Sequence, residues 1–88
     1  MYFAQFANKL EQHLRKNGIA CKDADMIIEE SSALYFEKLQ STGKFFKLMR
    51  KHDPAEVFIE SAHKAISRHL PEAKSTFGST TEIARVIH

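Results

Sequence analysis

The sequence has little of what several classes of small protein depend on. Its 88 residues include one cysteine, Cys21, so no internal disulfide can form and a disulfide-stapled secreted domain is excluded. No apolar run approaches the roughly 18 residues of a membrane span. The first residues also lack the basic start and apolar core of a signal peptide. We therefore expect a cytoplasmic protein that makes no membrane contact.

Residue patterns that indicate a catalytic or metal site are also missing. The histidines show neither an HExxH motif nor a pair at i and i+4, so we expect no metal. The three glycines are isolated, which excludes a phosphate-binding loop, and no nucleophile has a base at a recognisable spacing. His69 lies in the apolar arc of its segment, where we expect a neutral imidazole bonded to a carbonyl. We expect no enzymatic activity, no cofactor and no small-molecule substrate.

The sequence does contain helical periodicity. Apolar residues recur every three or four positions, and no segment alternates in the manner of a strand. Helices are expected at 2–17, 23–40, 44–52, 54–70 and 80–88. A chain of this length supports one domain. The sequence therefore predicts a single all-α domain over residues 1–88, a small compact bundle of four to five helices.

Capping residues set the expected helix boundaries. Gly18 is placed to end the first helix in the left-handed conformation, and Asp23 is a candidate N-cap for the second. Asp53 followed by Pro54 is a strong helix start, because proline at the first helical position loses no hydrogen bond. Ser79 begins a capping-box pattern ahead of the last helix.

The net charge of +2 conceals blocks of opposite sign. The charge is +3 over residues 1–22, −5 over 23–37, +5 over 38–52, −3 over 53–60 and +2 over 61–88. The +5 block places four basic side chains on one face of a helix: Lys44, Lys47, Arg50 and Lys51. This face either keeps the protein soluble or binds phosphates or an acidic protein surface, with Arg15 and Lys16 as further contacts.

The second expected helix, 23–40, has apolar residues on more than one face. Met26 and Ala33 lie nearly opposite its main apolar stripe and alternate with Glu30 and Glu37. Such a helix is either central to the fold or shared with a partner. Its acidic side chains are either a solvated face or a docking site for a basic surface, which the chain's own basic block could supply.

The last expected helix, 80–88, is short. Its apolar residues Ile83, Val86 and Ile87 form a narrow stripe with little else to cover them. We expect this helix to close the bundle lightly or to be swapped between two copies.

These patterns favour a non-enzymatic regulator or adaptor that binds another protein and forms a homodimer. Opposite charge blocks suit pairing of two copies about a two-fold axis. The predicted protein interface consists of Met26, Glu30, Ala33, Glu37, Ile83, Val86 and Ile87. The alternative is a small DNA- or RNA-binding transcriptional regulator that uses the basic face of residues 44–51. A weaker alternative is a phage or mobile-element inhibitor of a host protein.

Overall fold

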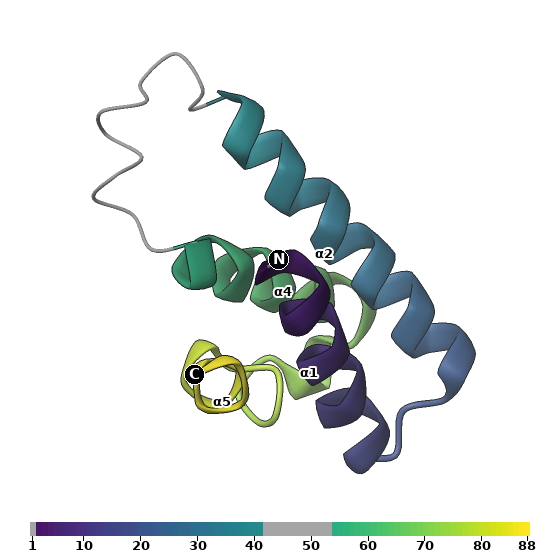
Figure 1. Cartoon of the computed structure of the whole chain (residues 1–88). Helices are drawn as coiled ribbons and strands as arrows, with labels where there is room; N and C mark the ends of the chain where they lie inside the picture. Colours follow the sequence, from purple (N-terminus) through teal and green to yellow (C-terminus); the bar gives the residue numbers. More distant parts are fainter. Residues whose placement is uncertain (1, 42–53) are drawn as a thin grey trace.

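Four α-helices make up the part of the chain that the computed structural model describes, residues 2–41 and 54–88. They are α1 (Tyr2–Lys16), α2 (Cys21–Ser41), α4 (Pro54–His69) and α5 (Thr80–Ile87), with a short 3-10 helix, η2 (Pro71–Ala73), before α5 (Figure 1). The described residues include no strand, so the predicted all-α class is confirmed. None of these helices is long and apolar enough to cross a membrane. The expected helix 44–52 lies outside the described residues.

The turn between α1 and α2 is built on a glycine. Gly18 has φ of 82°, its N–H donates to the Arg15 carbonyl at 3.0 Å, and the Ile19 N–H donates to the Leu14 carbonyl at 3.1 Å. This pair of bonds closes the end of α1 as predicted. The chain then re-enters a helix earlier than expected, at Cys21, so Asp23 lies in the first turn of α2 and is not its N-cap. An acidic side chain there still favours the helix dipole.

Helix α4 is the centre of the packing. It contacts α1, α2 and α5, and eight of its sixteen residues are buried. Phe58 is fully buried, and its ring lies 5.4 Å from that of Phe6 and 5.8 Å from that of Tyr35, measured between centroids. α2 runs along one side of the other helices and pairs mainly with α4 (Figure 1). Aromatic contacts therefore join α1, α2 and α4 around one ring.

Helix α5 contributes more to the core than the sequence suggests. Ile83 and Ile87 are 0% and 3% exposed, because α5 packs into the angle between α1 and α4. The Ser79 side chain caps the helix by accepting from the Glu82 N–H at 3.3 Å, as predicted. Lys9 Nζ in α1 also donates to the Ile87 carbonyl at 3.2 Å. Helix α5 therefore closes the bundle with two buried isoleucines and is packed on its own chain.

Two histidines fix the segment between α4 and α5. His13 Nε2 lies 2.7 Å from the Phe77 carbonyl oxygen, and His63 Nδ1 lies 2.7 Å from that of Gly78. Gly78 is buried, and a Cβ there would lie 2.4 Å from the Cγ2 methyl of Ile66. Two histidine donors from two helices and a close backbone approach therefore hold the start of α5 against the core.

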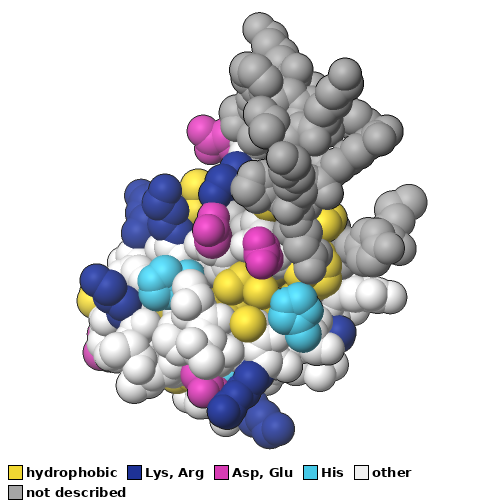
Figure 2. All heavy atoms as spheres, turned by 90° about the vertical axis from the view of Figure 1, so that its left-hand side faces the viewer, with side chains coloured by type: hydrophobic (Ala, Val, Ile, Leu, Met, Phe, Trp, Pro, Cys, Tyr) yellow, Lys and Arg dark blue, Asp and Glu magenta, His cyan; other side chains and the backbone are white. Residues whose placement is uncertain are grey.

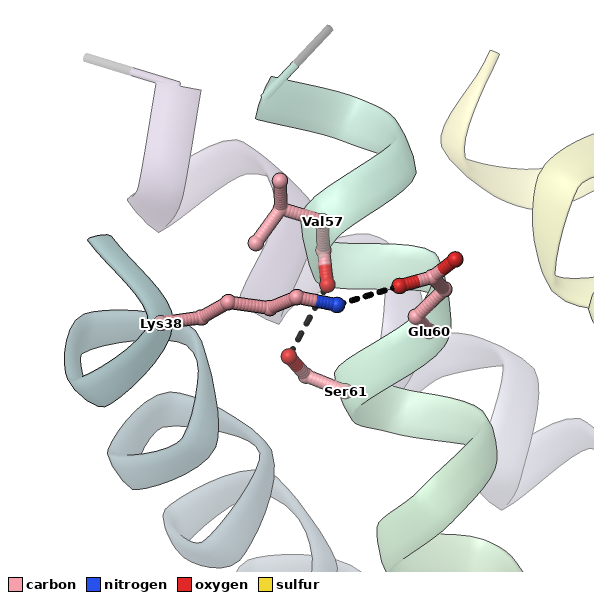
Figure 3. A network of polar contacts seen from close by, with 4 residues as sticks. All are labelled: Lys38, Val57, Glu60 and Ser61. Carbon is pink, nitrogen blue, oxygen red and sulfur yellow. Dashed lines mark hydrogen bonds and ion pairs between the residues drawn. The ribbon is translucent and has the colours of Figure 1, made fainter. Parts of the chain in front are cut away.

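Polar contacts tie α2 to α4 at the edges of their interface. Lys38 reaches from α2 to Glu60 on α4, with 2.5 Å between Nζ and Oε2 (Figure 3). Each of the two helices also has a buried serine, Ser31 in α2 and Ser61 in α4, which donates to the carbonyl four residues earlier in its own helix. These bonds within each helix satisfy both buried hydroxyl groups.

Candidate protein-binding surface

Helix α2 has a buried face and an exposed face. Ala24, Ile27 and Ser31 are fully buried, and Tyr35 is 5% exposed. Met26, which directly precedes Ile27, is 45% exposed. The apolar residues that the sequence places on two faces of this helix are therefore used in two ways. One set fills the core, and the other lies at the surface of the chain.

The exposed side is defined by four residues that we call the α2 outer face: Met26, Glu29, Ala33 and Glu37. Steps of three, four and four residues at 100° each place them within about 80° of arc. All four are exposed. Two are apolar and two are acidic, so this surface combines hydrophobic contact area with negative charge. The same geometry adds Glu29, which the predicted interface does not include.

A shallow depression of about 310 Å³ lies where α2 meets the end of α4. It is lined by Met26, Glu29, Glu30, Ala33 and His69. Three residues of the predicted interface, Met26, Glu30 and Ala33, are therefore neighbours in the structure. The contribution of α4, His69, could not be inferred from the periodicity of one helix, because it depends on how the two helices pack.

Glu30 belongs to the contact between helices and not to the exposed surface. Its side chain is 20% exposed, with Oε1 at 2.6 Å from Arg68 Nη1 and Oε2 at 2.5 Å from His69 Nε2. Both partners lie on α4, so this carboxylate joins α2 to α4. Two expectations change: Glu30 is engaged within the chain, and the partner of His69 is a carboxylate and not a backbone carbonyl.

The other acidic side chains on this side of α2 have no such partners in the part of the chain that the structure describes. Asp25, Glu29 and Glu37 are exposed, and none of the ion pairs among the described residues includes them. Their negative charge is therefore directed to solvent next to the apolar side chains of Met26 and Ala33. This is the main electrostatic feature of the α2 outer face.

The predicted interface residues of α5 lie elsewhere. Ile83 and Ile87 are in the core of this chain, and Val86 is half-buried. Side chains that are already covered within the chain add no exposed apolar area for a partner. Of the predicted interface, Met26, Ala33 and Glu37 are exposed on α2, whereas Glu30 contacts α4 and the two isoleucines of α5 are covered.

Of the predicted basic contacts, Lys44, Lys47, Arg50 and Lys51 lie outside the described residues. Arg15 is exposed and pairs with Glu11 at 3.2 Å. Lys16 lines a polar groove of about 560 Å³ together with residues of the loop and of α5, among them Ser75, Thr76 and Arg85. Arg85 was not predicted, because no local pattern shows that α1 and α5 are neighbours.

A second groove, of about 740 Å³, lies on the side formed by α4 and α5. Ile59 and Ala84 are among its lining residues, with Glu56 and Glu60 from α4. Figure 2 shows a small group of hydrophobic side chains there, with acidic and histidine side chains around it. Ile59 itself is only 6% exposed, whereas Met26 on α2 is 45% exposed.

The comparisons with known proteins add no relative to this description. No protein-family model, no curated protein and no solved structure matches the chain.

Proposed function

We propose that this protein is a non-enzymatic adaptor or regulator that binds another protein through the α2 outer face. One observation carries the proposal: Met26 is 45% exposed, beside Ala33 and carboxylates that have no partner among the described residues. Exposed apolar side chains within a charged border are typical of a surface that a partner covers. Covering them would remove apolar area from water, which is the main favourable contribution in most protein associations.

The surface favours a different protein over a second copy. Ile83 and Ile87 of α5 are buried within the chain, so they offer no exposed apolar stripe to a second copy. Two α2 outer faces brought together would also place Glu29 and Glu37 of each copy in a common acidic interface, which like-charge repulsion disfavours. The homodimer remains a prediction that sedimentation can test. If this chain is instead a phage or mobile-element inhibitor, the host protein that it inhibits would bind to the same α2 outer face.

A unique cysteine allows a direct test. Cys21 is exposed at the start of α2, about 7.5 Å along the helix axis from Met26. A photo-crosslinker attached there would capture proteins bound to the α2 outer face in an extract of the source cells. The captured protein is then identified, purified and titrated against the unmodified chain.

The critical variant is Ala33→Arg, which places a large charged side chain in the middle of the surface. Its matched control is Ala4→Arg, the same substitution at an exposed position of α1. We expect Ala33→Arg to weaken binding of the purified partner about tenfold or more, and Ala4→Arg to leave it unchanged. Equal binding by both variants would show that the α2 outer face is not the site.

The nucleic-acid alternative has one structural observation in its favour. Lys16 and Arg85 line the same polar groove with hydroxyl groups of Ser75 and Thr76, an arrangement that can contact phosphates. Glu82, 3.5 Å from Arg85, reduces the positive charge there. A mobility-shift titration at low salt tests this candidate. A shift that Lys16→Glu abolishes would support it, and the absence of a shift would exclude it.

A further inference from the structure

The exposed residues of α2 have the spacing of a helix that faces another helix. Lys22, Met26, Glu29, Ala33 and Phe36 follow one another in steps of four, three, four and three residues. This is the heptad spacing by which two helices keep one seam in contact. All five are exposed, with Met26 at 45% and Phe36 at 48%. The seam is about 21 Å long, or four helical turns.

The centre of this seam is small and its ends are large. Ala33 has only a methyl side chain, so a partner backbone can approach closely there, while Met26 and Phe36 extend on either side. The depression beside Met26 and Ala33, about 310 Å³, is large enough for an aliphatic side chain. A helix that lays its own apolar side chains at the same spacing along this seam would fit it.

The charge along the seam selects the kind of helix. Asp25, Glu29 and Glu37 are exposed carboxylates that no ion pair among the described residues neutralises. Lys22 is the one basic residue at a seam position. Arg68 and His69 at the α4 edge are directed to Glu30. A partner helix would therefore meet mainly negative charge, which attracts lysine and arginine and repels acidic side chains.

We infer that the occupant of the α2 outer face is a basic amphipathic helix of the partner protein. This inference rests on the proposed function and specifies the partner. Glu29 occupies a seam position between Met26 and Ala33, so the helix that binds best carries a lysine or arginine opposite it. A polar residue within a seam fixes the register of two helices, because any other alignment leaves its charge unpaired.

The probe for this inference is a synthetic three-heptad helical peptide. It carries leucine at the seam positions, lysine at the flanking positions and one lysine opposite Glu29. Its matched control has glutamate in place of every lysine. Each peptide bears a fluorophore, and its anisotropy is followed as the full chain is added at low salt and at physiological salt.

We expect the lysine peptide to bind with a roughly micromolar Kd, as small interfaces do, and the glutamate peptide not to bind. Glu29→Lys and Ala33→Arg should each weaken the lysine peptide about tenfold. Glu29→Lys should also lessen the discrimination against the glutamate peptide. Glu56→Lys, an equal change of charge at an exposed position of α4, should leave binding unchanged. Circular dichroism and thermal unfolding of each variant confirm that it is folded.

Three outcomes would overturn the inference. The first is equal binding of the lysine and glutamate peptides, or binding of neither. The second is a loss of affinity in Glu56→Lys as large as that in Glu29→Lys, which would indicate attraction by net charge alone. The third is a dimer of the chain in sedimentation that Ala33→Arg dissociates, which would identify a second copy as the occupant.

The peptide result and the crosslinking result separate the two proposals. If a captured partner requires Ala33 but the lysine peptide does not bind, the proposed function stands and the inference on the partner helix is wrong. If the peptide binds in an Ala33-dependent manner but no purified partner depends on Ala33, the surface recognises basic helices and the proposed function fails.

Discussion

Helices α4 and α2 differ in how much of their apolar surface the chain itself covers. α4 is enclosed by α1, α2 and α5, and half of its residues are buried. α2 packs on one side and leaves Met26 and Phe36 about half exposed. A helix in the centre of a bundle has most of its apolar side chains covered by the other helices, so its role is to form the core. A helix at the edge can serve the core with one face and a partner with the other.

The largest expected effect is a loss of stability at Ile27 on the buried face of α2, with the adjacent residue Met26 on the exposed face as its comparison. Ile27→Ala should lower the free energy of unfolding by about 2–5 kcal/mol, because it leaves a cavity at a fully buried position. Met26→Ala, one residue earlier, should change it by less than about 0.5 kcal/mol. Urea denaturation measures both. Similar losses would mean that Met26 supports the core, and the distinction between the two faces of α2 would fail.

The second effect tests the close packing around α4. Gly78→Ala should lower the free energy of unfolding by about 1–3 kcal/mol, since its Cβ would lie 2.4 Å from the Ile66 methyl and 2.7 Å from the Ala73 carbonyl oxygen. Gly18→Ala meets no atom within 4 Å, but its φ of 82° costs a side chain about 1 kcal/mol. Thermal unfolding should rank Gly78→Ala as the less stable variant. The reverse order would contradict tight packing there.

A smaller effect is expected at the edge between α2 and α4. Glu30→Gln should destabilise the protein by about 1 kcal/mol, because the amide cannot hold Arg68 and His69 as a carboxylate does. Glu37→Gln should have no measurable effect on stability, since Glu37 has no ion pair among the described residues. Chemical denaturation of both variants would distinguish a carboxylate used within the chain from one available to a partner.

The smallest effect concerns the buried face of α2 at high pH. Burial raises the pKa of Tyr35 above its ordinary value of 10.0, so the folded state favours the neutral phenol. The resulting stability is fully present below pH 10.0 and is lost as the pH rises through the folded-state pKa. The melting temperature should therefore fall more steeply above pH 10.0 in the natural chain than in Tyr35→Phe. Parallel curves would show that Tyr35 is not the group responsible.

The helices were predictable because their signals are local. Gly18 ends α1 and Ser79 caps α5 through backbone groups a few residues away, so the sequence contains all that is needed. The start of α2 was misplaced, because Asp23 is an acceptable first-turn residue as well as a good N-cap. Local patterns decide which segments are helical more firmly than where each one begins.

The candidate surface was only partly predictable, because it depends on contacts between distant segments. Periodicity shows that Met26 and Ile27 lie on different faces of a helix, but not which face the rest of the chain covers. Glu30 is engaged by Arg68, and Ile83 is covered by packing against α1 and α4. Each of these outcomes depends on a partner many positions away. For this reason the interface predicted from the sequence combines residues that are exposed in the structure with residues that the chain itself covers.

The contact between α1 and α5 has a consequence for the order of folding. The bond from Lys9 to the Ile87 carbonyl joins residues 78 positions apart, so the ends of the described chain must meet before it forms. Closing so long a loop is entropically unfavourable until the intervening helices have packed. α5 should therefore dock last during refolding and open first in native-state fluctuations. Amide hydrogen exchange should then be faster in α5 than in α4, although the side chains of Ile83 and Ile87 in α5 are buried.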